Sequence, residues 1–126
     1  MTPSHAIFRQ VFNECLAIHE DTYDFLPDAS AHYPFFFVGE GQFTESENLE
    51  LYGECVQTVH LYGLRQNRSG LDELTAQLLD RLKDLRETFD YQVSFKTANP
   101  RDMIDNTDVQ PLIHRVLDVR FSYVKK

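Results

Sequence analysis

The side chains that could bind a metal or act as nucleophiles are five histidines and two cysteines in a chain of 126 residues. No two of the histidines are four residues apart, the spacing that would place both on one face of a helix. A zinc site would therefore require convergence through the fold alone, and we expect neither a metal nor another cofactor. The residues are His5, His19, His32, His60, His114, Cys15 and Cys55.

The two cysteines do not form a Cys-x-x-Cys pair. The first twenty residues also lack the basic start and the continuous apolar run of a secretion signal. We interpret Cys15 and Cys55 as small buried hydrophobic residues of a protein kept in a reducing cytoplasm. A disulfide between them is the alternative.

An acidic stretch, RDMIDNTD at residues 101–108, places Asp102, Asp105 and Asp108 close together. A calcium-binding loop would also need a glycine at its sharp turn and a bidentate glutamate, and this stretch has neither. Asp and Asn side chains that bond their own backbone in turns are the simpler interpretation.

Two glycines flank basic residues in GLRQNRSG, residues 63–70. No Lys-Ser or Lys-Thr follows the second glycine, so the segment does not match a phosphate-binding loop. Arg65 and Arg68 are still candidates to contact an anion or an acidic partner near the start of the next helix. An ordinary solvated turn is the other interpretation.

The sequence shows no Gly-x-Ser-x-Gly motif and no specific pair of carboxylates. We therefore expect a protein that is not an enzyme. An enzyme that uses the segment from Asp102 to Asp108 together with His114 is kept as an alternative.

Two helices are predicted from the spacing of apolar residues. The first begins with Thr2 as N-cap and Pro3 at the first helical position, and it ends near His19. The second has Ser69 as its N-cap and a stripe of leucines that runs to Phe89.

Strands are expected at residues 33–42, 54–63, 91–96 and 113–124, the last two with strict alternation of apolar and polar residues. Residues 20–32 and 97–111 are expected to be loops. The order α-β-β-α-β-β predicts an α+β fold, in which two helices pack on one face of a mostly antiparallel sheet of about four strands. The length favours a single domain over residues 1–126.

Charge is distributed unevenly along the chain, whose net charge is −8. Residues 1–60 contain ten acidic residues and one basic residue, Arg9, whereas residues 61–126 contain ten acidic and eleven basic residues. This distribution argues against sequence-specific binding of nucleic acid, which needs clustered cations. It would let the acidic flank of one copy meet the basic flank of the next, although a solvated acidic face is an equal alternative.

Apolar residues at two places could form a surface for a partner protein. Tyr23, Phe25 and Leu26 lie in the otherwise polar segment 20–32. In YPFFFVGEGQ, residues 33–42, one pair of side chains must face away from the helices, and we place Phe36 and Val38 there. With Arg65 and Arg68, these five residues are the candidate interface.

YPFFFVGEGQ, the helix GLDELTAQLLDRLKDL and the C-terminal PLIHRVLDVRFSY together resemble small tail proteins of siphophages and prophages of Gram-positive bacteria. Those proteins are similar in plan to the tail-terminator, or tail-completion, proteins of long-tailed phages. The resemblance extends over roughly residues 5–124. It includes Tyr33, Pro34, Gly39 and Glu40 in the first strand and His114, Leu117 and Asp118 in the last.

The resemblance implies a structural role in the virion tail, with assembly in the host cytoplasm. Copies would form a ring, usually a hexamer, on the end of the tail tube. The ring would stop tube growth and contact the head-tail connector protein, so the implied partners are the chain itself, the tube protein and the connector. No membrane contact is expected. The alternative is a small cytoplasmic α+β protein-binding module of unrelated origin.

Overall fold

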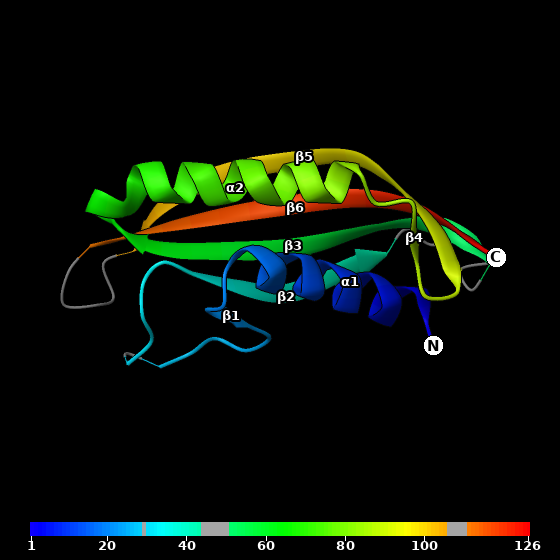
Figure 1. Cartoon of the computed structure of the whole chain (residues 1–126), viewed down its shortest axis with the longest axis horizontal. Helices are drawn as coiled ribbons and strands as arrows, with labels where there is room; N and C mark the ends of the chain where they lie inside the picture. The colour runs from blue at the N-terminus through cyan, green and yellow to red at the C-terminus, as the bar shows by residue number, and fades with distance from the viewer. Residues whose placement is uncertain (29, 44–50, 106–110) are drawn as a thin grey trace.

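The computed structural model describes residues 1–28, 30–43, 51–105 and 111–126. Two α-helices lie on one side of a six-stranded sheet (Figure 1). The helices are α1 (Pro3–Ile18) and α2 (Arg68–Lys83), and a short 3-10 turn, η1 (Arg65–Asn67), precedes α2. The strands are β1 (Thr22–Tyr23), β2 (Phe35–Phe43), β3 (Tyr52–Leu64), β4 (Glu87–Thr88), β5 (Tyr91–Asp105) and β6 (Leu112–Lys125).

The strand order across the sheet is β1-β2-β3-β6-β5-β4. The four long strands pair antiparallel, which agrees with the predicted α+β class and with helices on one face. The prediction of about four strands is incomplete, because β1 and β4 add a two-residue strand at each edge and β1 runs parallel to β2. Two residues are too few to show an alternation, so the sequence pattern could not reveal them.

Strand β5 is much longer than the predicted segment 91–96. It stays paired with β6 from Tyr91↔Lys125 to Asp105↔Leu112, with a bulge between Phe95 and Thr97. The expected loop 97–111 is therefore wrong for residues 97–105, while residues 106–110 lie outside the described part. Pro100 is compatible with the strand because β4 pairs only with the start of β5, and proline is tolerated on a sheet edge.

The start and end of α1 agree with the prediction. The Thr2 hydroxyl accepts a hydrogen bond from the backbone N–H of His5 at 3.2 Å, and Pro3 takes the first helical position. The helix ends where His19 adopts an extended conformation while its N–H still bonds the Cys15 carbonyl. The expected capping interaction therefore fixes the start of this helix.

The predicted boundaries of α2 need correction at both ends. The N-cap is Asn67 rather than Ser69, because η1 leads directly into the helix. The helix ends at Lys83, so Leu85 and Phe89 do not continue its stripe. Phe89 instead lies in the turn between β4 and β5 with a φ of 53° and 43% exposure.

Gly63 allows α2 to pack closely against β3. A Cβ atom at this position would lie only 3.0 Å from the side chain of Leu71, on the first turn of the helix. The leucine stripe of α2 and the apolar stripe of α1 then cover the same side of the sheet. The residues fully buried there include Val11, Cys15, Leu71, Leu78, Leu82, Val59, Leu61, Leu117 and Val119.

Phe36 and Val38 correct our assignment of the two faces of β2. Both have an exposed fraction of 0% and belong to the core beneath the helices. The pair that points to the other side is Phe35 and Phe37, which contact Tyr62 and His60. The period of two separates the pairs, but it does not say which pair faces the helices.

The molecule is elongated, and its two ends differ (Figure 1). Both chain termini and the turn between β4 and β5 lie at one end. The strands β5 and β6 extend to the other end, where α2 also begins. We call these the terminal end and the hairpin end.

Candidate interaction surfaces

The face of the sheet opposite the two helices, here called the bare face, carries a cluster of stacked rings from β2, β3 and β6. The His114 ring lies 4.2 Å from the Tyr62 ring and 4.9 Å from the His60 ring. Phe37 stacks on His60 and Phe35 stacks on Tyr62, both at 5.1 Å. Aromatic pairs of this kind stabilise beyond their buried area.

A chain of polar contacts runs through this ring cluster. A carboxylate oxygen of Glu40 lies 2.8 Å from His60 Nε2, and His60 Nδ1 lies 2.7 Å from His114 Nε2. His60 Nε2–H donates to the Glu40 carboxylate, whereas in the contact between the two histidines one facing nitrogen donates and the other accepts, so the imidazoles share a single proton there. The contact cannot survive protonation of both facing nitrogens.

The fold shifts the pKa values of two side chains in this series of polar contacts, Glu40 and His114. The hydrogen bond with His60 lowers the pKa of the Glu40 carboxyl below its usual value of 4.5. Burial, and then the charge of His60, lowers the pKa of His114 below 6.5. His114 is therefore favoured in its neutral form, which suits the shared proton.

The bulge in β2 directs Glu40 toward His60. The register of β2 with β3 shifts between Val38 and Gly41, which takes the Gly39 and Glu40 carbonyls out of the regular ladder. The buried Gln57 amide donates to both carbonyls, at 3.0 and 3.1 Å. Bulges commonly redirect a side chain in this way.

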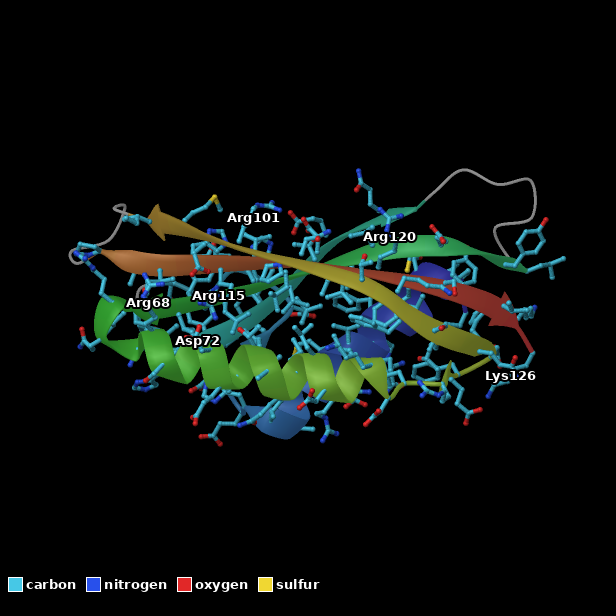
Figure 2. All side chains as sticks on the ribbon, turned by 90° about the horizontal axis from the view of Figure 1, so that it is seen from above. Arg68, Asp72, Arg101, Arg115, Arg120 and Lys126 are labelled. Carbon is cyan, nitrogen blue, oxygen red and sulfur yellow. The ribbon has the colours of Figure 1, made fainter. Side chains whose placement is uncertain are left out.

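A second polar cluster lies on the helix side of the sheet and centres on the buried Arg115. Its guanidinium donates two hydrogen bonds to Asp102, at 2.7 and 3.0 Å. It also lies 2.8 Å from Asp72 and donates to the Thr75 hydroxyl at 3.1 Å. Figure 2 shows Arg115 and Asp72 close together beside α2, so the cluster joins α2 to β5 and β6.

The Arg115 hydrogen bonds lower the pKa of the Asp102 carboxyl below its usual 3.8, although burial opposes the shift. Asp102 and Asp105 belong to β5, not to a turn, and Asp108 lies outside the described residues. The acidic stretch that could have formed a cation site therefore contributes Asp102 to an ion pair instead. Among the described residues, no group of three His, Cys, Asp or Glu side chains is arranged to hold a metal.

Both cysteines are buried and free, as expected for small apolar residues. Burial raises the pKa of the Cys55 thiol to about 12 and raises that of Cys15 further. A thiol that stays protonated is a poor nucleophile and a poor metal ligand.

The other candidate interface residues are on the surface. Phe25 and Leu26 are 60% and 58% exposed, and Tyr23 is half-buried between Phe25 and Phe35. Arg65 and Arg68 are exposed at the start of α2, and Arg68 reaches Asp102 at 3.4 Å. Their role in an interface stays a prediction, whereas Phe36 and Val38 are inaccessible to a partner in this fold.

The contact between His60 and His114 was not predicted from the sequence. They are 54 positions apart and become neighbours only because β3 pairs with β6, with Tyr62 opposite His114. The one available signal was that each lies on the polar side of an alternating strand. Neither described helix is long and apolar enough to cross a lipid bilayer.

No protein-family model and no curated protein matches the chain in sequence. Among solved structures, the fold is similar to a chain described as the virion of a native gene transfer agent particle. The TM-score is 0.70, and the similarity covers 98% of this chain and 97% of that chain, at 12% sequence identity. The two chains therefore share a fold over nearly their whole lengths.

Proposed function

We propose that this chain is a non-enzymatic structural protein of a phage or prophage tail, acting as a tail terminator or tail-completion component. Its copies assemble as a ring, a hexamer in the simplest case, on the end of the tail tube. The ring stops tube growth and helps to join the tail to the head connector. The chain then works in the virion tail after assembly in the host cytoplasm.

The observation that carries the proposal is the whole-length similarity to a chain of a phage-like virion particle. The similarity covers 98% of this chain and 97% of the neighbour, so it is not confined to a common substructure. Shared fold does not establish shared function, so the role rests also on this chain's surface. Exposed Phe25 and Leu26 and an uneven charge distribution suit a protein that contacts other proteins.

The buried groups also support a structural role. The titratable side chains with strong contacts form two separate clusters that tie elements together: Arg115 bonds Asp102 on the helix side, and His60 bonds His114 on the bare face. The two thiols are buried. These arrangements stabilise a scaffold, whereas an active site usually leaves at least one reactive group open to substrate.

Deletion of the gene in its phage or prophage tests the proposal. We expect tubes that grow beyond the normal length and heads that carry no tail, with both defects corrected by the wild-type gene. Electron microscopy of negatively stained lysates measures tube length and the fraction of joined particles. Tails of normal length on normal heads, in the absence of the protein, would overturn the proposal.

A further inference from the structure

The two helices leave one groove on each outer flank. The α1 groove, of about 440 Å³, is lined by His5, Phe8, Arg9, Phe12, Asn13 and Asp24, on the side of α1 that faces away from α2. The α2 groove, of about 490 Å³, lies between α2 and β5 and includes Asp72, Ala76, Leu79, Pro100, Asp102 and Arg115. The sheet order places β1 and β4 at opposite edges, so the grooves lie on opposite flanks of the molecule.

Exposed apolar side chains accompany both grooves. On the α1 flank, Leu16 is 45% exposed, and Phe25 and Leu26 follow Asp24 directly. On the α2 flank, Ile104 is 71% exposed on the same side of β5 as Pro100. Apolar residues that gather on two separate flanks are typical of contact surfaces.

The charges of the two flanks are opposite toward the hairpin end, whereas Arg9, the basic side chain of the α1 groove, lies over the Phe89 ring in the turn between β4 and β5. No lysine or arginine occurs between Arg9 and Arg65, so the segment that joins α1 to β2 carries only acidic charges, among them Glu20, Asp24 and Asp28. On the α2 flank, Arg65 and Arg68 are exposed, while Asp72 and Asp102 are engaged with Arg115.

The acidic segment of one flank and the arginines of the other lie at a similar position along the long axis of the molecule. The connection between β1 and β2 extends toward the hairpin end, and α2 begins at that end (Figure 1). Figure 2 places Arg68 there, close to Arg115. Two copies set side by side with their long axes parallel would bring the acidic segment of one copy near Arg65 and Arg68 of the other.

We propose that the α1 flank of one copy packs against the α2 groove of a second copy, with Phe25 and Leu26 near Leu79, Pro100 and Ile104. The contact joins two different surfaces, so it repeats around a ring instead of ending at a dimer. An isologous contact would place acidic flank on acidic flank, and like charges disfavour it. This inference rests on the proposed function, from which it takes a second copy as the partner.

Two charge-reversal variants test the contact. Asp24→Lys with Asp28→Lys makes both flanks basic, and Arg65→Glu with Arg68→Glu makes both flanks acidic. Each variant alone should self-associate about tenfold more weakly than wild type, or worse, because every contact becomes repulsive. An equimolar mixture should recover assembly near the wild-type level, since alternating copies again present opposite charges. Sedimentation velocity and native mass spectrometry measure both effects.

Lys125→Glu with Lys126→Glu is the matched control for the acidic variant. It makes the same change in net charge at the terminal end, so we expect wild-type association. Circular dichroism and urea unfolding check that all variants fold, which we expect because the replaced side chains are exposed. Repulsion that the control shows equally, or a mixture that fails to recover assembly, would overturn the contact.

Tail tubes separate this inference from the proposed function. If the charge variants bind tube ends with the same number of copies as wild type, the contact is wrong while the function stands. If wild type binds tube ends as isolated copies, both the contact and the ring of the proposed function are wrong. If wild type remains monomeric at the highest attainable concentration and ignores tubes, both proposals fail.

Discussion

The sheet carries one buried polar cluster on each face, and the two clusters differ in chemistry. On the helix side, Arg115 joins the carboxylates of Asp72 and Asp102, and its hydrogen bonds lower the pKa of Asp102. On the bare face, Glu40 and two histidines form a chain of polar contacts, in which burial lowers the pKa of His114. The Asp102 contact on the helix side should therefore persist to more acidic pH than the contacts of His114 on the bare face.

The largest difference in stability between the two faces should appear when one phenylalanine of each face is replaced by alanine. Phe36→Ala removes a side chain with 0% exposure beneath α1, which should lower the free energy of unfolding by about 3–5 kcal/mol. Phe37→Ala removes a half-buried ring from the bare face and should cost about 1 kcal/mol. Urea unfolding followed by circular dichroism measures both. Equal losses would mean that the bare face is as tightly packed as the core.

The next effect concerns the ion pair on the helix side. Arg115→Met leaves Asp102 and Asp72 without their buried partner and should lower stability by about 3 kcal/mol. The control is Arg120→Met, because Arg120 makes an exposed contact with Glu54 at 3.4 Å and should contribute about 0.5 kcal/mol or less. A loss at Arg115 no larger than at Arg120 would show that the buried cluster does not lock α2 to the sheet.

A smaller effect should appear as pH dependence on the bare face. The folded state lowers the pKa of His114, so its contribution is complete above the ordinary value of 6.5 and is lost as pH falls through the lower folded value. Stability should therefore decline below pH 6.5 in wild type and decline less in His114→Gln. Chemical denaturation at a series of pH values provides the test, and parallel curves for the two proteins would contradict it.

The contribution of Asp102 to stability should also be lost as pH falls, but in a more acidic range than that of His114. The pKa of Asp102 is lowered from 3.8, so its contribution is full above that value and is lost only as pH falls through the lower folded value. Between pH 6.5 and pH 4, Arg115→Met should then lower stability by a nearly constant amount. If the stability lost in Arg115→Met varied strongly between pH 6.5 and pH 4, the two clusters would not differ in the pH range in which they stabilise the fold.

Local patterns predicted much of this fold from sequence. The alternation in residues 113–124 identified the buried side of β6, because one side of that strand is apolar. Thr2 and Pro3 identified the start of α1, because capping involves only neighbouring residues. The leucine stripe identified α2 itself but not its ends.

What the sequence did not reveal depends on pairing between distant segments. The second half of β5 contains Asn99 and Pro100, which are typical of turns, yet β6 provides a full set of ladder partners for it. Phe36 and Phe35 are equally apolar and both are buried, so only the position of the helices decides which of them belongs to the core beneath α1 and α2. The Arg115 and His60 clusters each combine residues from three elements, and no local spacing indicates such a contact.

The position of the chain termini has a practical consequence for experiments. Tyr91 holds the Met1 carbonyl at 3.3 Å, and Lys126 contacts Glu87 at 2.8 Å, so both ends are anchored beside the turn between β4 and β5. A gold or fluorescent label fused to either terminus would mark the same pole of the subunit. Under the proposed function, images of labelled particles would show which pole of the subunit faces the tail tube and which faces the head.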